Sequence, residues 1–209
     1  ATKVMLGESL KDLGYVGMAK FDHVAVKASV FPFLKLVGVD SILGPEMKST
    51  GEVMGIDKNY GAAMYKAMVS AGNKLPMQGG VYVTVSDADK ANILPMVKDL
   101  HEMGFTIYAT KGTSTYMRNT GVPVTTVYKV AENVSPDALG LMRRGEINLI
   151  INTPTYSSGS RRDGYMMRRL AVELEIPFLT TVHGAKATVC AIKRARQGDL
   201  KVRDIASYH

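Results

Sequence analysis

The feature that most constrains the fold is a regular alternation of strand-like and helix-like segments after residue 80. The run VYVTVS at 81–86 is apolar, as a buried strand is, and DADKANILPMVKDLHEMG follows it with apolar residues at helical spacing. The alternation continues through TIYAT, TTVYKV, NLIINT and PFLTT, each followed by a helical segment. Five strands alternating with helices predict an α/β domain with a doubly wound, five-stranded parallel sheet covered on both faces.

The residues before this pattern look like an incomplete unit. A turn-rich stretch, AGNKLPMQGG at 71–80, marks the boundary. Ahead of it lie two strand-like runs, HVAVKASVF and GEVMGID, joined by GVDSILGPEMKST, and one helix-like run, NYGAAMYKAMVSAG. Two strands and one or two helices are too few to enclose a core of their own. We therefore expect an α+β remnant at 1–75, whose body lies upstream, and the α/β domain at 76–209.

Charge is distributed unevenly along the chain. Lys and Arg outnumber Asp and Glu by 26 to 19, and every arginine lies between Arg118 and Arg203. Such an excess favours a phosphorylated or polyanionic partner. The basic runs are short and lack interleaved aromatic residues, which argues against nucleic acid.

The sequence also points to a cytoplasmic compartment. No apolar run approaches the ~20 residues that cross a bilayer, so we expect no membrane association. The N-terminus lacks the layout of a secretory signal and an initiator Met, which suggests that the chain begins partway through a longer protein. The single cysteine, Cys190 in ATVCAI, excludes an internal disulfide, suits a reducing cytosol and is expected to be a small core residue.

Polar residues gather where the predicted strands end, which is where open α/β sheets bind ligands. The stretch YATKGTST at 108–115 ends one strand with a glycine that permits a tight turn, and a helix is expected from Thr113. The free N–H groups of that helix would point toward a bound anion. Together with hydroxyl and ammonium groups, they suit a phosphate monoester held by charge-assisted hydrogen bonds rather than by a metal. The candidates from four strand ends are Ser86, Lys90, Thr110, Lys111, Gly112, Thr113, Lys129, Asn152, Thr153 and Thr155.

These residues also have plainer interpretations. A threonine such as Thr113 before a helix is usually an N-cap, and Ser86 with Asp89 resembles a capping box. Lys90 and Lys111, taken alone, would be solvated surface lysines. Only their convergence at one sheet edge favours a binding site.

Signatures of catalysis are missing from the sequence. It contains neither G-x-x-x-x-G-K-[ST] nor G-x-G-x-x-G, and its four histidines lack metal-ligand spacing, so no metal site is predicted. His183, in TTVHG, is a candidate pocket residue, although a capping or surface role explains it equally well. We predict no catalytic residues in this chain.

The sequence resembles a known family over nearly its whole length. The segment GVDSILGPEMKSTGEVMGIDKNYGAAMYKA is similar to the end of the second ATP-grasp unit in the large subunit of carbamoyl-phosphate synthase, and LGPEMKSTGEVMG is a long and specific match. The part from about Gly79 onward resembles the regulatory domain of the same subunit, which has the methylglyoxal-synthase-like fold. The order of the two parts and the linker agree with that resemblance.

The resemblance implies a function as well as a fold. The parent enzyme is a glutamine-hydrolysing ligase that makes carbamoyl phosphate from bicarbonate, glutamine-derived ammonia and two ATP, with Mg or Mn, for pyrimidine and arginine biosynthesis. Its regulatory domain binds UMP, IMP or phosphoribosyl pyrophosphate as allosteric effectors. The fragment itself should be inactive and need no cofactor, because the catalytic core lies upstream. The implied partners are the rest of the large subunit, the glutaminase small subunit and, in some assemblies, further copies of the chain.

The same resemblance assigns roles to the strand-end residues. Matches to the family's phosphate-binding positions fall on Lys90, Thr110, Gly112, Thr113, Lys129, Asn152 and Thr153. Additional effector contacts are suggested for Ser86, Lys111, Thr155, Arg161 and Arg162, the last two matching paired arginines of the family. The polar segment PTYSSGSRRDG at 154–164, expected to be a loop, is longer here than in the family, which leaves the contacts to base and ribose open.

Two enzymes related to the same fold are alternatives. Methylglyoxal synthase, which acts on dihydroxyacetone phosphate, needs a carboxylate base in a glycine-rich loop after the third strand. Here that stretch reads KVAENVSPD, with Glu132 and Asp137 as its carboxylates and no glycine. The cyclohydrolase domain of purine synthesis has a similar first loop but no ATP-grasp segment ahead of it.

Overall fold

A computed structural model describes residues 1–18, 20–36, 38–128, 132, 134–153, 158–198 and 200–208, with only the backbone at 158–162. Its main body is a five-stranded sheet in the order β5-β4-β3-β6-β7, with every neighbouring pair parallel. The strands are β3 (Gly80–Thr84), β4 (Thr106–Thr110), β5 (Thr125–Val127), β6 (Leu149–Asn152) and β7 (Phe178–Leu179). The order reverses between β3 and β6, which confirms the predicted doubly wound α/β sheet.

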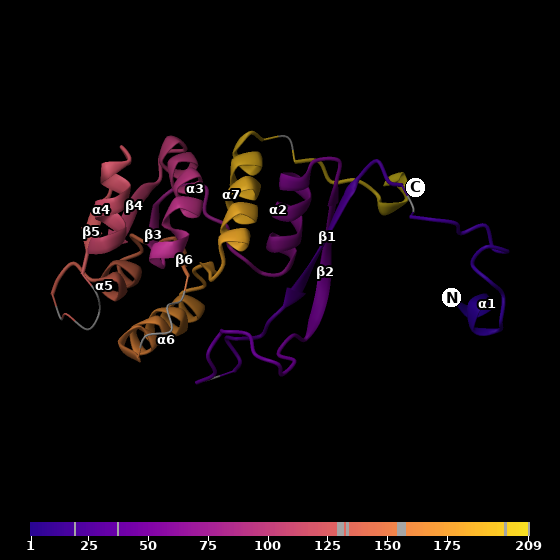
Figure 1. Cartoon of the computed structure of the whole chain (residues 1–209), viewed down its shortest axis with the longest axis horizontal. Helices are drawn as coiled ribbons and strands as arrows, with labels where there is room; N and C mark the ends of the chain where they lie inside the picture. The colour runs from indigo at the N-terminus through magenta and orange to yellow at the C-terminus, as the bar shows by residue number, and fades with distance from the viewer. Residues whose placement is uncertain are drawn as a thin grey trace.

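Helices cover both faces of this sheet, as Figure 1 shows. Alternate strand residues point to opposite faces, so Val81 and Val83 belong to one core and Tyr82 to the other. The first core is closed by α3 (Lys90–Glu102), α4 (Lys111–Asn119) and α7 (Val182–Arg196). The second core is closed by α5 (Ala138–Arg143) and α6 (Ser158–Glu173). A short 3₁₀ turn, η1 (Asp87–Asp89), leads into α3.

The N-terminal part forms a small two-stranded unit beside this body. β1 (Val24–Val30) pairs antiparallel with β2 (Gly51–Asp57), and α2 (Tyr60–Ser70) packs on both strands and on α7. A four-residue helix, α1 (Thr2–Met5), lies far from the sheets in Figure 1. The C-terminal 3₁₀ turn, η3 (Ile205–Tyr208), returns to this unit, where the Tyr208 hydroxyl donates to the carbonyl of Ile56 over 3.3 Å.

Three expectations about local structure were wrong. The second α/β helix begins at Lys111 rather than Thr113, because the chain passes directly from β4 into α4 at Thr110. The segment 154–164 is not wholly a loop, since α6 starts at Ser158. Cys190 is exposed rather than in the core, although it lies in α7 as expected.

Candidate functional site

The ends of β3 and β6 meet at the point where the strand order reverses. Asn152 and Thr153 at the end of β6 are both buried. The Thr153 hydroxyl accepts a 3.0 Å hydrogen bond from the backbone N–H of Ser86, just beyond β3. Two predicted site residues from distant parts of the sequence are thus in direct contact, because adjacent parallel strands end at the same edge of the sheet.

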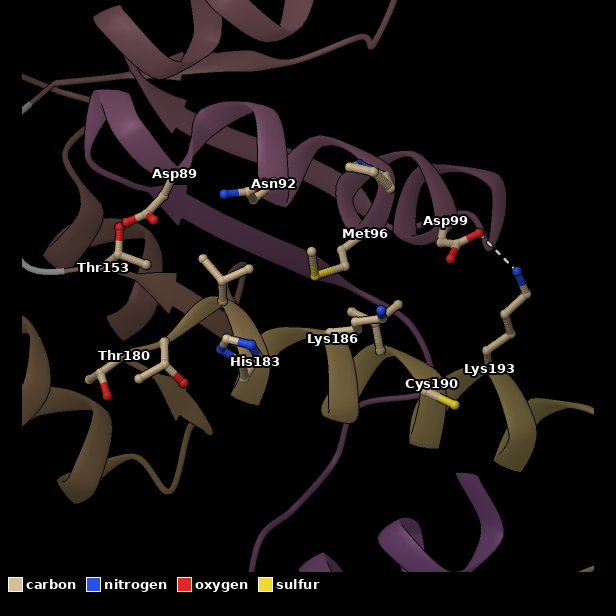
Figure 2. Close-up of a pocket in the computed structure, with 14 residues that line it drawn as sticks. Asp89, Asn92, Met96, Asp99, Thr153, Thr180, His183, Lys186, Cys190 and Lys193 are labelled. Atoms are coloured by element: carbon tan, nitrogen blue, oxygen red, sulfur yellow. Dashed lines mark hydrogen bonds and ion pairs between the residues drawn. The ribbon is translucent and has the colours of Figure 1, made fainter. Parts of the chain in front are cut away.

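Asp89 joins the same group of side chains. Its carboxylate accepts a 2.7 Å hydrogen bond from the Ser86 hydroxyl, and the hydrogen bonds from Ser86 and Thr153 lower its pKa. Figure 2 shows the carboxylate turned toward Thr153. The predicted capping box does not form, since the Ser86 side chain makes no hydrogen bond to a helix N–H and donates to Asp89 instead.

Lys90 connects the first strand end to the second. Its ammonium donates to the carbonyl of Gly112 in the first turn of α4 over 3.1 Å and lies 2.6 Å from the Asp87 carboxylate. The Lys90 side chain is only 15% exposed, whereas Asp87 is 94% exposed. Lys90 is therefore not the solvated surface lysine of the plainer interpretation, and its carboxylate partner could move away at little cost.

The start of α4 offers backbone donors to the same place. Thr110 is the N-cap residue, but its side chain makes no capping hydrogen bond. The first N–H groups of the helix, at Lys111, Gly112 and Thr113, have no partner within a helix and carry the positive end of its dipole. Thr113 is buried within the first turn, so its interpretation as the N-cap was wrong.

Gly112 serves a different purpose from the predicted tight turn. It lies inside α4, and among the described residues a side chain added there would come within 4 Å only of the Lys90 ammonium, at 3.7 Å. The absence of a side chain leaves the helix start open beside Lys90.

The remaining predicted residues differ in how much of each is described. Lys129 and Thr155 lie outside the described residues, and Arg161 and Arg162 are described only as backbone in α6. Lys111 is exposed at the start of α4.

A cavity of about 890 Å³ runs between α3 and α7, starting at the same sheet edge. Of the predicted residues it includes Thr153. His183 is among the lining residues and is exposed at the start of α7, which fits both the pocket and the surface interpretation. Sequence reasoning missed Asn92, Thr181 and Lys186 in its walls. Figure 2 shows Asn92 on α3 and Lys186 on α7, together with the Asp99–Lys193 ion pair that joins the two helices. Helical spacing could have grouped these residues by helix, but not paired the two helices.

Two carboxylates matter for the methylglyoxal synthase alternative. Asp137 is the N-cap of α5, where it accepts a 2.9 Å hydrogen bond from the N–H of Gly140. It therefore has a structural role in this fold. Glu132 is exposed in the segment ahead of α5.

The described residues contain no group of three or more His, Cys, Asp or Glu side chains placed to hold a metal ion. None of their helices is long and apolar enough to cross a membrane. The geometry divides the predicted site into a cationic part at Lys90 and the start of α4, and a carboxylate-centred part at Ser86, Asp89 and Thr153.

Comparison with known proteins identifies close relatives. A family model described as an MGS-like domain matches residues 92–180. The C-terminal section of the carbamoyl phosphate synthase large chain from Methanocaldococcus jannaschii is 50% identical over 97% of this chain and 34% of its own length. The corresponding section from Methanopyrus kandleri is 45% identical over 100% of this chain and 39% of its length.

Longer relatives match in the same way. The carbamoyl phosphate synthase large chain of Methanoregula boonei is 47% identical over 100% of this chain and 20% of its own length. This chain therefore spans between about a fifth and two fifths of these three relatives. Among solved structures, a methylglyoxal synthase from Elizabethkingia anophelis aligns with 55% of this chain and 79% of its own at 15% identity and a TM-score of 0.44, a likeness too distant to bear on function.

Proposed function

We propose that this chain, which belongs to the carbamoyl phosphate synthase large-chain family and matches its C-terminal section, is the effector-binding regulatory part of that enzyme. Its ligand is a small phosphorylated molecule, a nucleotide or sugar phosphate such as UMP, IMP or phosphoribosyl pyrophosphate. Residues 1–75 are the end of a synthetase domain and residues 76–209 the regulatory domain.

The observation that carries this proposal is the contact between Lys90 and the first turn of α4. The Lys90 side chain is 15% exposed and its ammonium contacts the first turn of α4. The first N–H groups of that helix have no partner within the helix, and both kinds of donor favour an anion. The glycine at 112 leaves this position open. A phosphate here would displace the exposed Asp87 carboxylate and take its place beside Lys90.

The second part of the site suits a different portion of the ligand. The Asp89 carboxylate repels a phosphate but accepts hydrogen bonds, as it does from Ser86 and Thr153. We therefore assign the phosphate to the β4 side of β3 and sugar hydroxyls to the β6 side. Lys129, Asn152 and Thr155 remain proposed contacts, as do Lys111, Arg161 and Arg162.

The activity of the complete enzyme is part of the same proposal. We expect it to make carbamoyl phosphate from bicarbonate, glutamine-derived ammonia and two ATP with Mg or Mn. Catalysis then belongs to the remainder of the large chain and the glutaminase small subunit, with which this chain associates. Effector binding would change the rate of carbamoyl phosphate synthesis by favouring either the more active or the less active state of the complete enzyme. The coupling free energy would be about 1–3 kcal/mol.

Calorimetric titration at fixed salt with UMP, IMP and phosphoribosyl pyrophosphate tests the proposal. We expect one of them to bind with a Kd between about 1 μM and 1 mM, or roughly −8 to −4 kcal/mol. Dihydroxyacetone phosphate serves as the comparison, with methylglyoxal release measured in parallel. No detectable binding of any of the three effectors, or production of methylglyoxal from dihydroxyacetone phosphate, would contradict the proposed function.

A further inference from the structure

Three side chains on one face of α6 hold the connection between β1 and β2. Tyr165 donates its hydroxyl to the carbonyl of Gly38 over 3.2 Å. Arg168 forms a two-pronged ion pair with Asp40, through Nε–Oδ1 and Nη2–Oδ2 distances of 2.7 and 2.6 Å. Arg169 donates to the carbonyl of Leu36 over 3.2 Å. Positions 165, 168 and 169 are spaced to share one side of a helix.

The central contact of this group has little freedom to shift. Arg168 is only 5% exposed, and its guanidinium occupies space that a side chain at Gly164 would enter, at 2.9 Å from Nη1. A buried charge must keep its partner, since losing the partner leaves it without compensation. The planar guanidinium also fixes the orientation of the carboxylate. Movement of α6 would therefore move residues 38–40 with it or break the pair.

The opposite side of α6 rests on the strands that end at the proposed site. Met167 and Ala171 belong to the same buried cluster as Tyr82 of β3 and Ile150 of β6. Those two strands end at the Ser86–Thr153 contact. In Figure 1, α6 lies below the sheet, and the chain that links β1 to β2 runs beside it. One helix thus touches both the binding edge of the regulatory domain and the N-terminal unit.

We propose that α6 is the element that couples effector occupancy to the N-terminal unit, and that the Arg168–Asp40 pair is its contact with that unit. The inference rests on the proposed function, because it requires an effector at the edge formed by β3, β4 and β6. A ligand that draws the ends of β3 and β6 together shifts the surface on which α6 packs. The shift reaches residues 33–36 and 38–40 through the three side chains of α6. Coupling between two sites is reciprocal. A substitution that weakens the contact between α6 and the N-terminal unit must therefore change effector affinity by the same factor by which it changes the effect of the effector on that unit.

Hydrogen exchange measured by mass spectrometry on the whole chain, with and without a saturating effector, tests this inference. The probe is whichever of UMP, IMP and phosphoribosyl pyrophosphate binds the unmodified chain by calorimetry. We expect the probe to change exchange in peptides covering 33–40 by about fivefold, at the lower end of usual coupling. In Asp40→Asn, and more weakly in Tyr165→Phe, the probe should still bind but this change should shrink to about twofold or less. Glu146→Gln, which breaks the exposed Arg144–Glu146 pair elsewhere, is the control and should behave like the unmodified chain.

The possible results separate the two proposals. If the probe binds and exchange at 33–40 does not respond, or if the response survives in both Asp40→Asn and Tyr165→Phe, the role of α6 is wrong while the proposed function stands. If none of the three compounds binds the unmodified chain, the proposed function and this inference fall together. Tyr165→Phe removes a single hydroxyl, so it gives an answer even if Asp40→Asn folds poorly.

Discussion

The hydroxyl of Thr153 accepts a hydrogen bond from the backbone N–H of Ser86 and so joins the end of β6 to the loop after β3. The same hydroxyl helps to lower the pKa of Asp89. This contact joins the two strand ends at the point where the strand order reverses, and it places the Asp89 carboxylate at the proposed effector site.

Thr153→Val should destabilise the fold, because valine keeps the shape of threonine but leaves the Ser86 N–H without its acceptor. We expect a loss of about 1–2 kcal/mol in the free energy of unfolding, measured with urea. Thr115→Val is the matched control, since the exposed Thr115 hydroxyl donates only to Lys111 within α4, and it should cost less than about 0.5 kcal/mol. Equal losses in the two variants would show that the Ser86–Thr153 hydrogen bond contributes no more to the free energy of unfolding than an exposed hydroxyl does.

Lys90→Met should weaken effector binding without unfolding the domain. A charge-assisted hydrogen bond contributes about 1.5–3 kcal/mol, so Kd measured by calorimetry should rise about 10- to 100-fold. Lys98→Met removes the same charge from an exposed position on the same helix and should leave Kd within about twofold. An unchanged Kd in Lys90→Met would show that Lys90 does not contact the effector.

Asp87→Asn should bind the effector more tightly, because the Asp87 carboxylate competes for the Lys90 ammonium at 2.6 Å. Because an exposed ion pair of this kind contributes little, we expect Kd to fall by only about two- to fivefold. Asp99→Asn removes a carboxylate of α3 that pairs with Lys193 of α7 and is the control for overall charge. If both variants tighten binding equally, the effect is one of net charge and not of competition at Lys90.

The Arg168–Asp40 pair predicts a particular dependence of stability on pH. The hydrogen bond from Arg168 holds the pKa of Asp40 below its ordinary value of 3.8 in the folded chain. The carboxylate therefore contributes stability that is fully present above about pH 5 and is lost as pH falls through the folded pKa. Asp40→Asn should lower the free energy of unfolding by about 2 kcal/mol at pH 7, less than for a fully buried pair because Asp40 is 33% exposed.

The same comparison gives the test of this pH effect. Urea unfolding at pH 7 and at pH 3 should show the difference between the unmodified chain and Asp40→Asn becoming smaller at the lower pH. A difference that is independent of pH would mean that the carboxylate charge does not stabilise the contact.

Gly55→Ala should disrupt the N-terminal unit. A side-chain carbon at Gly55 would lie 2.0 Å from the carbonyl oxygen of Ala63 and 2.4 Å from the backbone nitrogen of Ala67, so α2 would have to move away from β2. We expect a loss of about 3 kcal/mol, at the upper end for overpacking, since the clashing atoms are backbone. Gly51→Ala in the same strand meets nothing within 4 Å and is the control. Thermal unfolding of both variants measures the difference, and similar melting temperatures would refute the close packing.

Much of the fold was predictable because the relevant signals are local. The spacing of Ile93, Met96, Val97 and Leu100 predicted α3, and all four are buried against the sheet. Alternating strands and helices predicted a parallel sheet, and the ends of parallel strands meet at one edge whatever their loops contain. The convergence of Ser86, Lys90, Gly112 and Thr153 follows from that rule.

The errors arose where long-range contacts outweighed local preference. Lys111 and Gly112 are weak signals for a helix start, yet α4 begins there, with Lys90 bonded to the Gly112 carbonyl and Thr113 buried below it. Cys190 lies in an apolar run, but α7 packs between α2 and α3 in a way that leaves this residue on the wall of the cavity. Periodicity shows that a helix has an apolar side and does not show what covers it.

From the sequence alone, one could determine the order of strands and helices, the doubly wound sheet and the edge at which polar residues gather, because these depend on side-chain periodicity and chain geometry. Only the tertiary structure decided that the Lys90 ammonium contacts the Asp87 carboxylate and the Gly112 carbonyl. It also decided that the Ser86 hydroxyl donates to Asp89 and does not cap a helix N–H, and that Arg168 forms an ion pair with Asp40. Those contacts join residues from different elements, and the favourable geometry of each hydrogen bond or ion pair exists only once the elements have packed.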